Sequence, residues 1–242
     1  MDLHGKIAMV TGGAVRVGRA IALALARGGA DVALHYGRSA DAAGEVADAI
    51  RRLGRRAEAF PADLSDPAQI ERLLSQVAEA FGRLDVLVNS AAVYYATPID
   101  ALTAEQWDRE LAVNARAPAL CVRHALPLMS AGGAIINITD ASAESGRGGY
   151  VAYAASKGAL LSLTRSLSKA LAPRNIRVNS VAPGVAAFPA SADDAYKAKI
   201  LAGVPMRRAG TPEDIAAAVV FLATSDYITG QNLRVDGGWQ MG

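Results

Sequence analysis

The chain has 242 residues, of which 52% are hydrophobic and 20% are charged, and its formal net charge is +2. This near balance argues against proteins that bind nucleic acids or anionic membranes through a basic excess. The length and apolar fraction predict a single α/β domain over residues 1–242 with a substantial core.

Cysteine and histidine offer no metal-ligand spacing. The one cysteine, Cys121, lies in an apolar stretch, and the three histidines are scattered, so we expect an inert buried thiol and no metal. The N-terminal apolar run is too short for a signal peptide, and no run of about 18 apolar residues occurs. We therefore expect no membrane span and a cytoplasmic location.

Short apolar runs alternate with longer helical patterns along the chain. Strands are predicted at Ile7–Thr11, Asp31–Tyr36, Ala57–Pro61, Val86–Asn89, Ala134–Ile138, Ile176–Val181 and Asn232–Val235. Helices are predicted over 17–28, 41–53, 67–81, 104–130, 152–172 and 212–224, and an irregular stretch over 183–206. This alternation is typical of βαβ units with right-handed crossovers. It predicts a Rossmann-type, doubly wound parallel sheet of seven strands.

A glycine-rich turn follows the first predicted strand and opens a helix. It runs from Thr11 to Gly18 and includes Gly12, Arg16 and Val17. Glycine lets the backbone approach a pyrophosphate, and a helix N-terminus offers free N–H groups and a positive dipole. A glycine-rich turn alone is a weak signal. The prediction of a dinucleotide site depends on the position of this turn between a strand and a helix.

The end of the second strand distinguishes between the nicotinamide cofactors. An acidic residue there would bind the ribose 2′-hydroxyl, whereas this chain has Arg38 and Ser39, which suit a 2′-phosphate. We therefore predict NADPH/NADP+ as the cofactor. The alternative is that Arg38 is a surface cation and Ser39 only caps the next helix.

Polar residues also follow the third and fourth strands. Asp63, next to Leu64, is placed to accept from the adenine amino group, or it caps the following turn. Asn89 and Ala91 are placed beside the ribose and nicotinamide, or Asn89 ties two strands together.

The chemistry is predicted at Tyr153 and Lys157, four residues apart on one helix face, with Asp140 at the end of a strand. An ammonium near a phenol lowers the phenol pKa and makes it a better general acid. Asn114 lies inside a predicted helix, where asparagine is disfavoured, so it either holds a water for proton relay or is a helix defect.

Together these motifs resemble the short-chain dehydrogenase/reductase family over essentially the whole chain. The resemblance also covers Pro183, Gly184 and the segment 235–238. It implies strand order 3-2-1-4-5-6-7, a homotetramer, a cofactor site that includes Pro183 and Gly184, and catalysis by asparagine, serine, tyrosine and lysine.

Two departures from that family pattern narrow the resemblance. Arg16 stands where the family has glycine, and Asp140 where it has serine. With the segment His35–Ala40, these departures resemble the pteridine reductase branch, which implies that His35 and Tyr36 belong to the cofactor site. The branch also implies that Tyr94 stacks on a pterin and that Arg16 bridges the ring and the pyrophosphate. Ala92 stands where the branch often has serine.

The main hypothesis is an NADPH-dependent reductase that transfers hydride to a C=N bond of a pteridine, either a dihydropterin or a folate-type compound. Arg16, Tyr94, Asp140 and Tyr153 would bind the substrate, and residues 184–206 would form the substrate loop, with 188–199 as part of a lid. One alternative is a generic carbonyl reductase for ketoacyl or sugar ketones. Another is a non-catalytic NADPH-binding sensor.

Overall fold

A computed structural model describes residues 1–186, 188 and 193–240, and the strands in this part of the chain form a seven-stranded sheet. The strands are β1 (Ile7–Thr11), β2 (Asp31–Tyr36), β3 (Ala57–Pro61), β4 (Val86–Asn89), β5 (Ala134–Ile138), β6 (Arg177–Pro183) and β7 (Asn232–Val235). Their order is β3-β2-β1-β4-β5-β6-β7, and all neighbouring pairs are parallel. The predicted doubly wound sheet and its strand order are confirmed.

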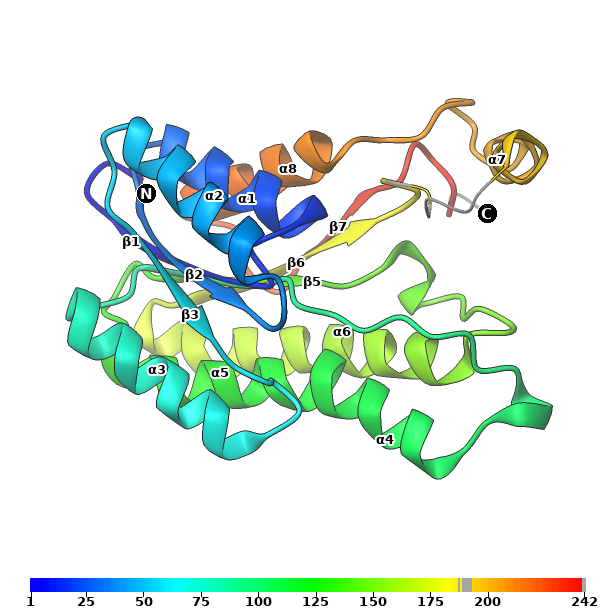
Figure 1. The fold of residues 1–242 in the computed structure, drawn as a ribbon, viewed down its shortest axis with the longest axis horizontal. Helices are drawn as coiled ribbons and strands as arrows, with labels where there is room; N and C mark the ends of the chain where they lie inside the picture. Colours follow the sequence, from blue (N-terminus) through cyan, green and yellow to red (C-terminus); the bar gives the residue numbers. More distant parts are fainter. Residues whose placement is uncertain (187, 189–192, 241–242) are drawn as a thin grey trace.

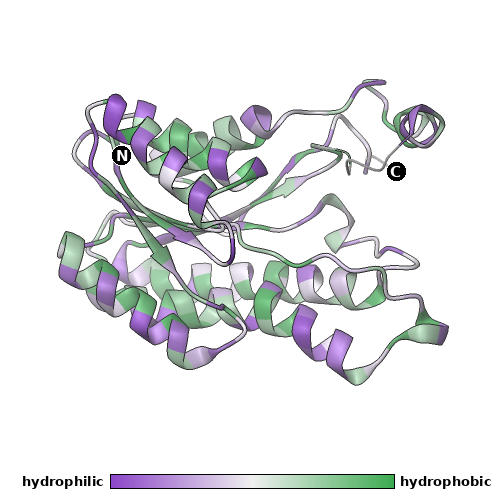
Figure 2. Ribbon diagram, in the orientation of Figure 1, coloured by the Kyte–Doolittle hydropathy of each residue, from purple (hydrophilic) through white to green (hydrophobic). Residues whose placement is uncertain are grey.

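Helices cover both faces of the sheet (Figure 1). One layer contains α1 (Arg16–Arg27), α2 (Ala40–Arg52) and α8 (Pro212–Thr224). The other contains α3 (Pro67–Phe81), α4 (Ala104–Leu111), α5 (Ala117–Ala125) and α6 (Val151–Leu171). Their hydrophilic residues lie mainly on the outward faces (Figure 2).

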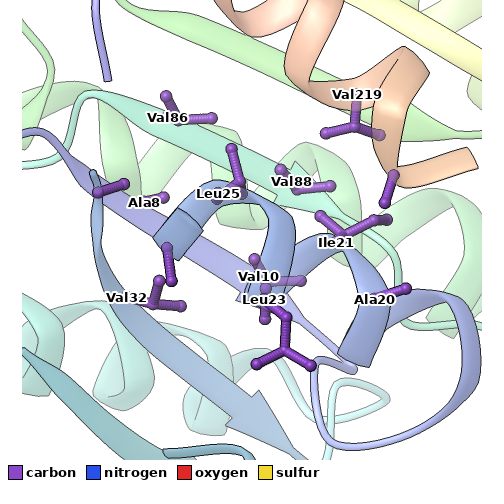
Figure 3. Close-up of a cluster of buried hydrophobic side chains, with 14 of the residues drawn as sticks. Ala8, Val10, Ala20, Ile21, Leu23, Leu25, Val32, Val86, Val88 and Val219 are labelled. Atoms are coloured by element: carbon purple, nitrogen blue, oxygen red, sulfur yellow. The ribbon is translucent and has the colours of Figure 1, made fainter. Parts of the chain in front are cut away.

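The central strands are buried on both sides. In β1, Ala8 and Val10 belong to the cluster that includes Ile21 of α1 and Val219 of α8 (Figure 3). The alternate residues of β1 pack into the opposite layer. Since successive side chains point to opposite faces, a strand covered on both sides is buried throughout, and β1 and β4 are apolar except for Thr11 and Asn89 at their carboxyl ends.

The predicted helix over 104–130 is wrong as a single helix. A π-helical segment, Ala112–Arg116, separates α4 from α5, and Pro118 lies in the first turn of α5. Proline lacks an N–H for the preceding turn, and a π turn inserts one residue while keeping the chain helical. The apolar pattern therefore continues across the break.

The irregular stretch predicted over 183–206 contains a helix, α7 (Asp194–Ala202). Asp193 caps it by accepting a hydrogen bond from the Tyr196 backbone N–H at 2.7 Å. Strand β6 also extends to Pro183, two residues beyond the prediction. Residues 187 and 189–192 of the predicted substrate loop lie outside the described residues.

Within the described ranges, no helix is long and apolar enough to cross a membrane. The same residues contain no cluster of three or more metal-ligating side chains. Cys121 is fully buried, and burial raises the pKa of its thiol to about 12, as expected for an inert core residue.

Candidate active site

A cavity of about 1060 Å³ lies at the carboxyl ends of the strands. Parallel α/β sheets bind ligands at this edge, where the chain crosses to opposite faces between neighbouring strands such as β1 and β4. Fifteen predicted site residues line it: Gly12, Arg16, Val17, Gly18, His35, Arg38, Asp63, Leu64, Ala91, Tyr94, Asp140, Tyr153, Lys157, Pro183 and Gly184. Four predicted residues are not part of its lining: Tyr36, Ser39, Asn89 and Asn114.

The turn after β1 requires its glycines. A Cβ on Gly12 would lie 2.8 Å from the Ala91 Cα atom, and one on Gly18 would lie 2.1 Å from the Gly12 carbonyl oxygen. Gly12 also has a φ of 64°, a conformation that side-chain-bearing residues rarely adopt. The glycines therefore bring β1, the loop after β4 and the start of α1 into contact.

Two side chains fix this turn from either side. Thr11 Oγ1 accepts hydrogen bonds from the backbone N–H groups of Ser90 at 3.0 Å and Ala91 at 3.1 Å. His35 Nδ1 accepts from the Gly12 N–H at 3.0 Å, and its Nε2 lies 3.1 Å from the Ala62 carbonyl oxygen. Burial lowers the pKa of His35, which favours the neutral ring that this pattern needs. His35 therefore positions the glycine turn, a role that the sequence did not predict.

Arg16 adopts the left-handed conformation with a φ of 51°, at the position where the family pattern has glycine. A non-glycine residue there costs about 1 kcal/mol or more, and such strain concentrates at functional sites. The exposed side chain lines the cavity, so the strain coincides with a cation directed at the predicted cofactor site.

Replacing Arg16 with glycine should relieve this strain and remove one guanidinium. We expect Arg16→Gly to raise the free energy of unfolding by about 1 kcal/mol and to weaken NADPH binding roughly 10-fold. Urea denaturation and a fluorescence titration with NADPH measure the two effects. A loss of stability together with unchanged NADPH affinity would contradict both parts.

Around the predicted 2′-phosphate and adenine sites, Arg38 lines the cavity, while Ser39 precedes α2 without making a side-chain capping bond. Asp63 Oδ1 accepts from the Ser65 N–H at 2.9 Å and its hydroxyl at 2.8 Å. These two hydrogen bonds are the largest causes that lower the pKa of Asp63. The positive charges of Arg109 and Arg38 lower it further. The turn-capping alternative for Asp63 is therefore confirmed, and its adenine contact stays a prediction.

The catalytic candidates meet at the start of α6. Tyr153 donates its hydroxyl proton to Asp140 Oδ2 at 2.9 Å. Asp140 Oδ1 accepts from the Ser142 N–H at 2.7 Å and the Ser142 hydroxyl at 2.5 Å, which fixes the carboxylate. Lys157 donates from Nζ to the Ile138 carbonyl oxygen at 2.7 Å. Tyr153 and Lys157 are only 7% and 3% exposed, so both act in a desolvated setting.

The predicted lowering of the Tyr153 pKa by Lys157 is wrong. The pKa of Tyr153 lies well above its usual value, because burial and the Asp140 carboxylate both disfavour a phenolate. Lys157 Nζ lies 5.7 Å from the Tyr153 ring centroid and donates to a backbone carbonyl instead. Tyr153 therefore stays protonated at neutral pH, and it needs a partner that replaces its proton after each transfer.

Burial lowers the pKa of Lys157 to about 8, despite the opposing influence of the Asp140 and Glu110 carboxylates. The ammonium is present below this pH and loses its proton as the pH rises through about 8. We therefore expect kcat/KM for NADPH to fall above pH 8, because this parameter reports groups of the free enzyme. Initial rates from pH 6 to 10 test this, and a limb at the ordinary lysine pKa near 10.4 would contradict it.

The two predicted asparagines have structural partners. Asn89 Nδ2 donates to Asn137 Oδ1 at 2.9 Å, so it ties β4 to β5. Asn114 Oδ1 accepts from the Val93 N–H at 2.9 Å, and its Nδ2 donates to Glu110 Oε2 at 2.7 Å. These bonds anchor the π-helical segment to the loop after β4. They leave the predicted water-holding role of the Asn114 side chain untested.

An aromatic cluster next to Tyr153 was largely missed. Tyr94 stacks on Tyr150 with centroids 4.4 Å apart and an interplanar angle of 9°, and its ring meets Tyr153 edge-on at 4.6 Å. The Trp239 ring and the Arg147 guanidinium next to it also line the cavity. Only Tyr94 was predicted, because Arg147, Tyr150 and Trp239 come from segments without a local motif.

Comparisons with known proteins identify the family to which this chain belongs. The family model described as enoyl-(acyl carrier protein) reductase matches residues 13–240. The 3-oxoacyl-[acyl-carrier-protein] reductase of Staphylococcus aureus is 36% identical, covering 98% of each chain. Hydroxynaphthalene reductase of Aspergillus fumigatus is 35% identical, covering 93% of this chain and 88% of its own. The chain belongs to the short-chain dehydrogenase/reductase family.

Solved structures agree with this assignment. A blue fluorescent protein from a metagenomic library, in complex with NADPH, is 38% identical with a TM-score of 0.93, covering 99% of each chain. A short-chain dehydrogenase from Burkholderia cenocepacia, in complex with NADP, is 39% identical with a TM-score of 0.93 over the same shares. The chain is thus an oxidoreductase of this family, and its substrate is a separate question, since one fold hosts many activities.

Proposed function

We propose that the cavity binds NADPH. The glycine turn leaves no room for side chains, as close approach to a pyrophosphate requires. Even without Arg147, cationic side chains outnumber acidic ones in the cavity lining: Arg16, Arg38, Arg72, Arg109 and Lys157 against Asp63 and Asp140. NADPH carries a pyrophosphate and a 2′-phosphate, so its charge suits this lining. The two solved relatives described above also hold NADPH or NADP.

We further propose that the substrate is a pteridine, reduced at a C=N bond. The observation that carries this proposal is the hydrogen bond from Tyr153 Oη to Asp140 Oδ2 at 2.9 Å. A carboxylate beside the general acid would repel a carbonyl oxygen that gains negative charge. It would instead attract the N–H groups of a pterin, whose reduction puts a proton on nitrogen. The Tyr94 ring stacks on Tyr150 with one face and would offer its other face to a flat heterocycle.

NADPH would supply the hydride that reaches the ring carbon. Tyr153 transfers its hydroxyl proton to the neighbouring nitrogen, so that C=N becomes CH–NH. Because the Tyr153 phenolate is strongly disfavoured, a proton from solvent in the cavity passes through the Asp140 carboxylate back to Tyr153. Lys157 would hold the nicotinamide ribose through its ammonium, and Arg16 would bridge the pyrophosphate and the pterin.

Carbonyl reduction is the second candidate. The named relatives favour it, since they include a 3-oxoacyl-[acyl-carrier-protein] reductase and an NADPH-dependent aldehyde reductase of Arabidopsis thaliana that is 37% identical. Among the named proteins above, none is a pteridine reductase, so the pteridine proposal depends on Asp140, Arg16 and Tyr94 rather than on the comparisons.

The proposed function is tested by following NADPH oxidation with a substrate panel. The panel contains a dihydropterin, dihydrofolate, a 3-oxoacyl thioester and a simple aldehyde, each assayed with NADPH and NADH. We expect dihydropterins to be preferred among the substrates and NADPH to have the lower KM. Preference for the oxoacyl thioester or aldehyde would establish the second candidate, and absence of turnover with NADPH bound would favour a sensor. Equal KM values would remove Arg38 from the phosphate site.

The family resemblance also supports a homotetramer, while the cytoplasmic location stays a prediction. Light scattering on the purified protein measures the assembly, and a monomer or dimer would contradict this part of the proposal.

A further inference from the structure

Arg147 lies beside Tyr94, a proposed substrate-binding residue, and has no role in the chemistry described above. It belongs to the segment between Asp140 and α6, and Gly146 and Gly149 on either side of it have φ values of 77° and 78°. Its side chain is half-buried and lines the cavity together with Tyr94, Tyr153 and Trp239.

Aromatic rings surround the Arg147 guanidinium. Its Cζ atom lies 4.9 Å from the Tyr150 ring centroid, 5.6 Å from that of Tyr94 and 6.0 Å from that of Trp239. Rings at these distances hold a guanidinium through cation–π attraction and remove part of its water shell. Because two of these rings also stack on each other, the cation is positioned before any ligand arrives.

No carboxylate in the described part of the chain forms an ion pair with this guanidinium. The carboxylate of Asp140, the nearby acidic group of the site, accepts hydrogen bonds from Tyr153 and Ser142 instead. A partly desolvated, pre-positioned guanidinium without a protein partner is suited to bidentate binding of an anion. Tyr94 contacts both Arg147 and Tyr153, so the anion site and the reacting bond are separated by about one aromatic ring.

We propose that Arg147 forms an anion-binding subsite that selects substrates with an acidic tail. This inference builds on the proposed function, and it narrows the substrate from pteridines in general to folate-type pteridines with carboxylates. A dihydropterin without an acidic tail would contact only the residues around the pterin ring. Arg147 is thus a specificity-determining residue, distinct from the cations that face the cofactor.

The test compares dihydrofolate with a tail-free dihydropterin, which share the reacting ring. We expect Arg147→Met, which keeps an apolar stem, to lower kcat/KM for dihydrofolate at least 10-fold, mainly through KM. The same variant should change kcat/KM for the tail-free pterin less than 3-fold, and Arg147→Lys should retain part of the dihydrofolate preference. Titration of each variant with NADPH should give an unchanged Kd, which separates this subsite from the cofactor site.

Equal losses for the two pterins, or no loss for either, would overturn the subsite. If the wild-type enzyme reduces ketones and no pterin, the proposed function fails, and Arg147 is then tested with an oxo acid and its methyl ester. A loss of at least 10-fold for the acid alone would support the anion subsite. A loss shared by acid and ester, or absent from both, would reject it.

Discussion

Replacing Tyr153 with phenylalanine should lower turnover by about 100-fold to 10,000-fold while NADPH binding stays within about 2-fold. The phenylalanine keeps the edge-on contact with Tyr94 and loses only the hydroxyl that donates to Asp140. Stopped-flow or steady-state rates measure the loss, and fluorescence titration measures the NADPH Kd.

Tyr227→Phe is a matched control for Tyr153→Phe. It makes the same chemical change at a residue that is 101% exposed, and it should leave both rate and binding unchanged. Thermal melts of both variants verify that they are folded. Turnover of Tyr153→Phe at the wild-type rate would remove Tyr153 from the role of proton donor.

Replacing Asp140 with serine should change the enzyme's substrate preference. Serine restores the residue of the broader family pattern and keeps an oxygen for the Ser142 N–H, but it removes the charge beside Tyr153. We expect pterin reduction to fall by on the order of 10-fold to 100-fold, because the carboxyl no longer returns a proton to Tyr153. We expect ketone reduction to rise, because repulsion of the developing alkoxide is gone.

Asp140→Asn separates charge from shape in the same experiment. The amide occupies nearly the same volume, so any change shared by the serine and asparagine variants is due to the lost carboxylate. The pKa of Tyr153 should fall in both variants, since Asp140 is one of the causes of its rise. Faster pterin reduction by Asp140→Ser, or slower ketone reduction, would contradict the assigned role.

The sheet was predictable because its strands are short apolar runs bounded by turn residues. Six strands have the predicted bounds, and the order follows from the family resemblance. The π turn at 112–116 leaves the apolar pattern intact, so its only signal in the sequence was Asn114, which is disfavoured inside a helix. Helix α7 was missed because it has no buried residues and so presents no apolar periodicity along the sequence.

The site was predictable where its residues follow strands or share a helix face. Carboxyl ends of parallel strands lie at one edge, which brought Gly12, Asp140 and Pro183 to the same cavity. Arg147 and Trp239 come from irregular segments, whose paths depend on tertiary packing rather than on local pattern. The spacing of Tyr153 and Lys157 was informative, but the direction of the pKa shift depended on a contact with Asp140 that spacing does not reveal.

The most direct measurement follows the label from NADPH deuterated at the transferred position, in a mixture of a dihydropterin and a 3-oxoacyl thioester at equal concentrations. The proposed function predicts deuterium on a ring carbon of the reduced pterin, with little labelled hydroxyacyl product, and at least about 100-fold slower labelling for Tyr153→Phe. Deuterium appearing mainly on the hydroxyacyl carbon would contradict the pteridine assignment.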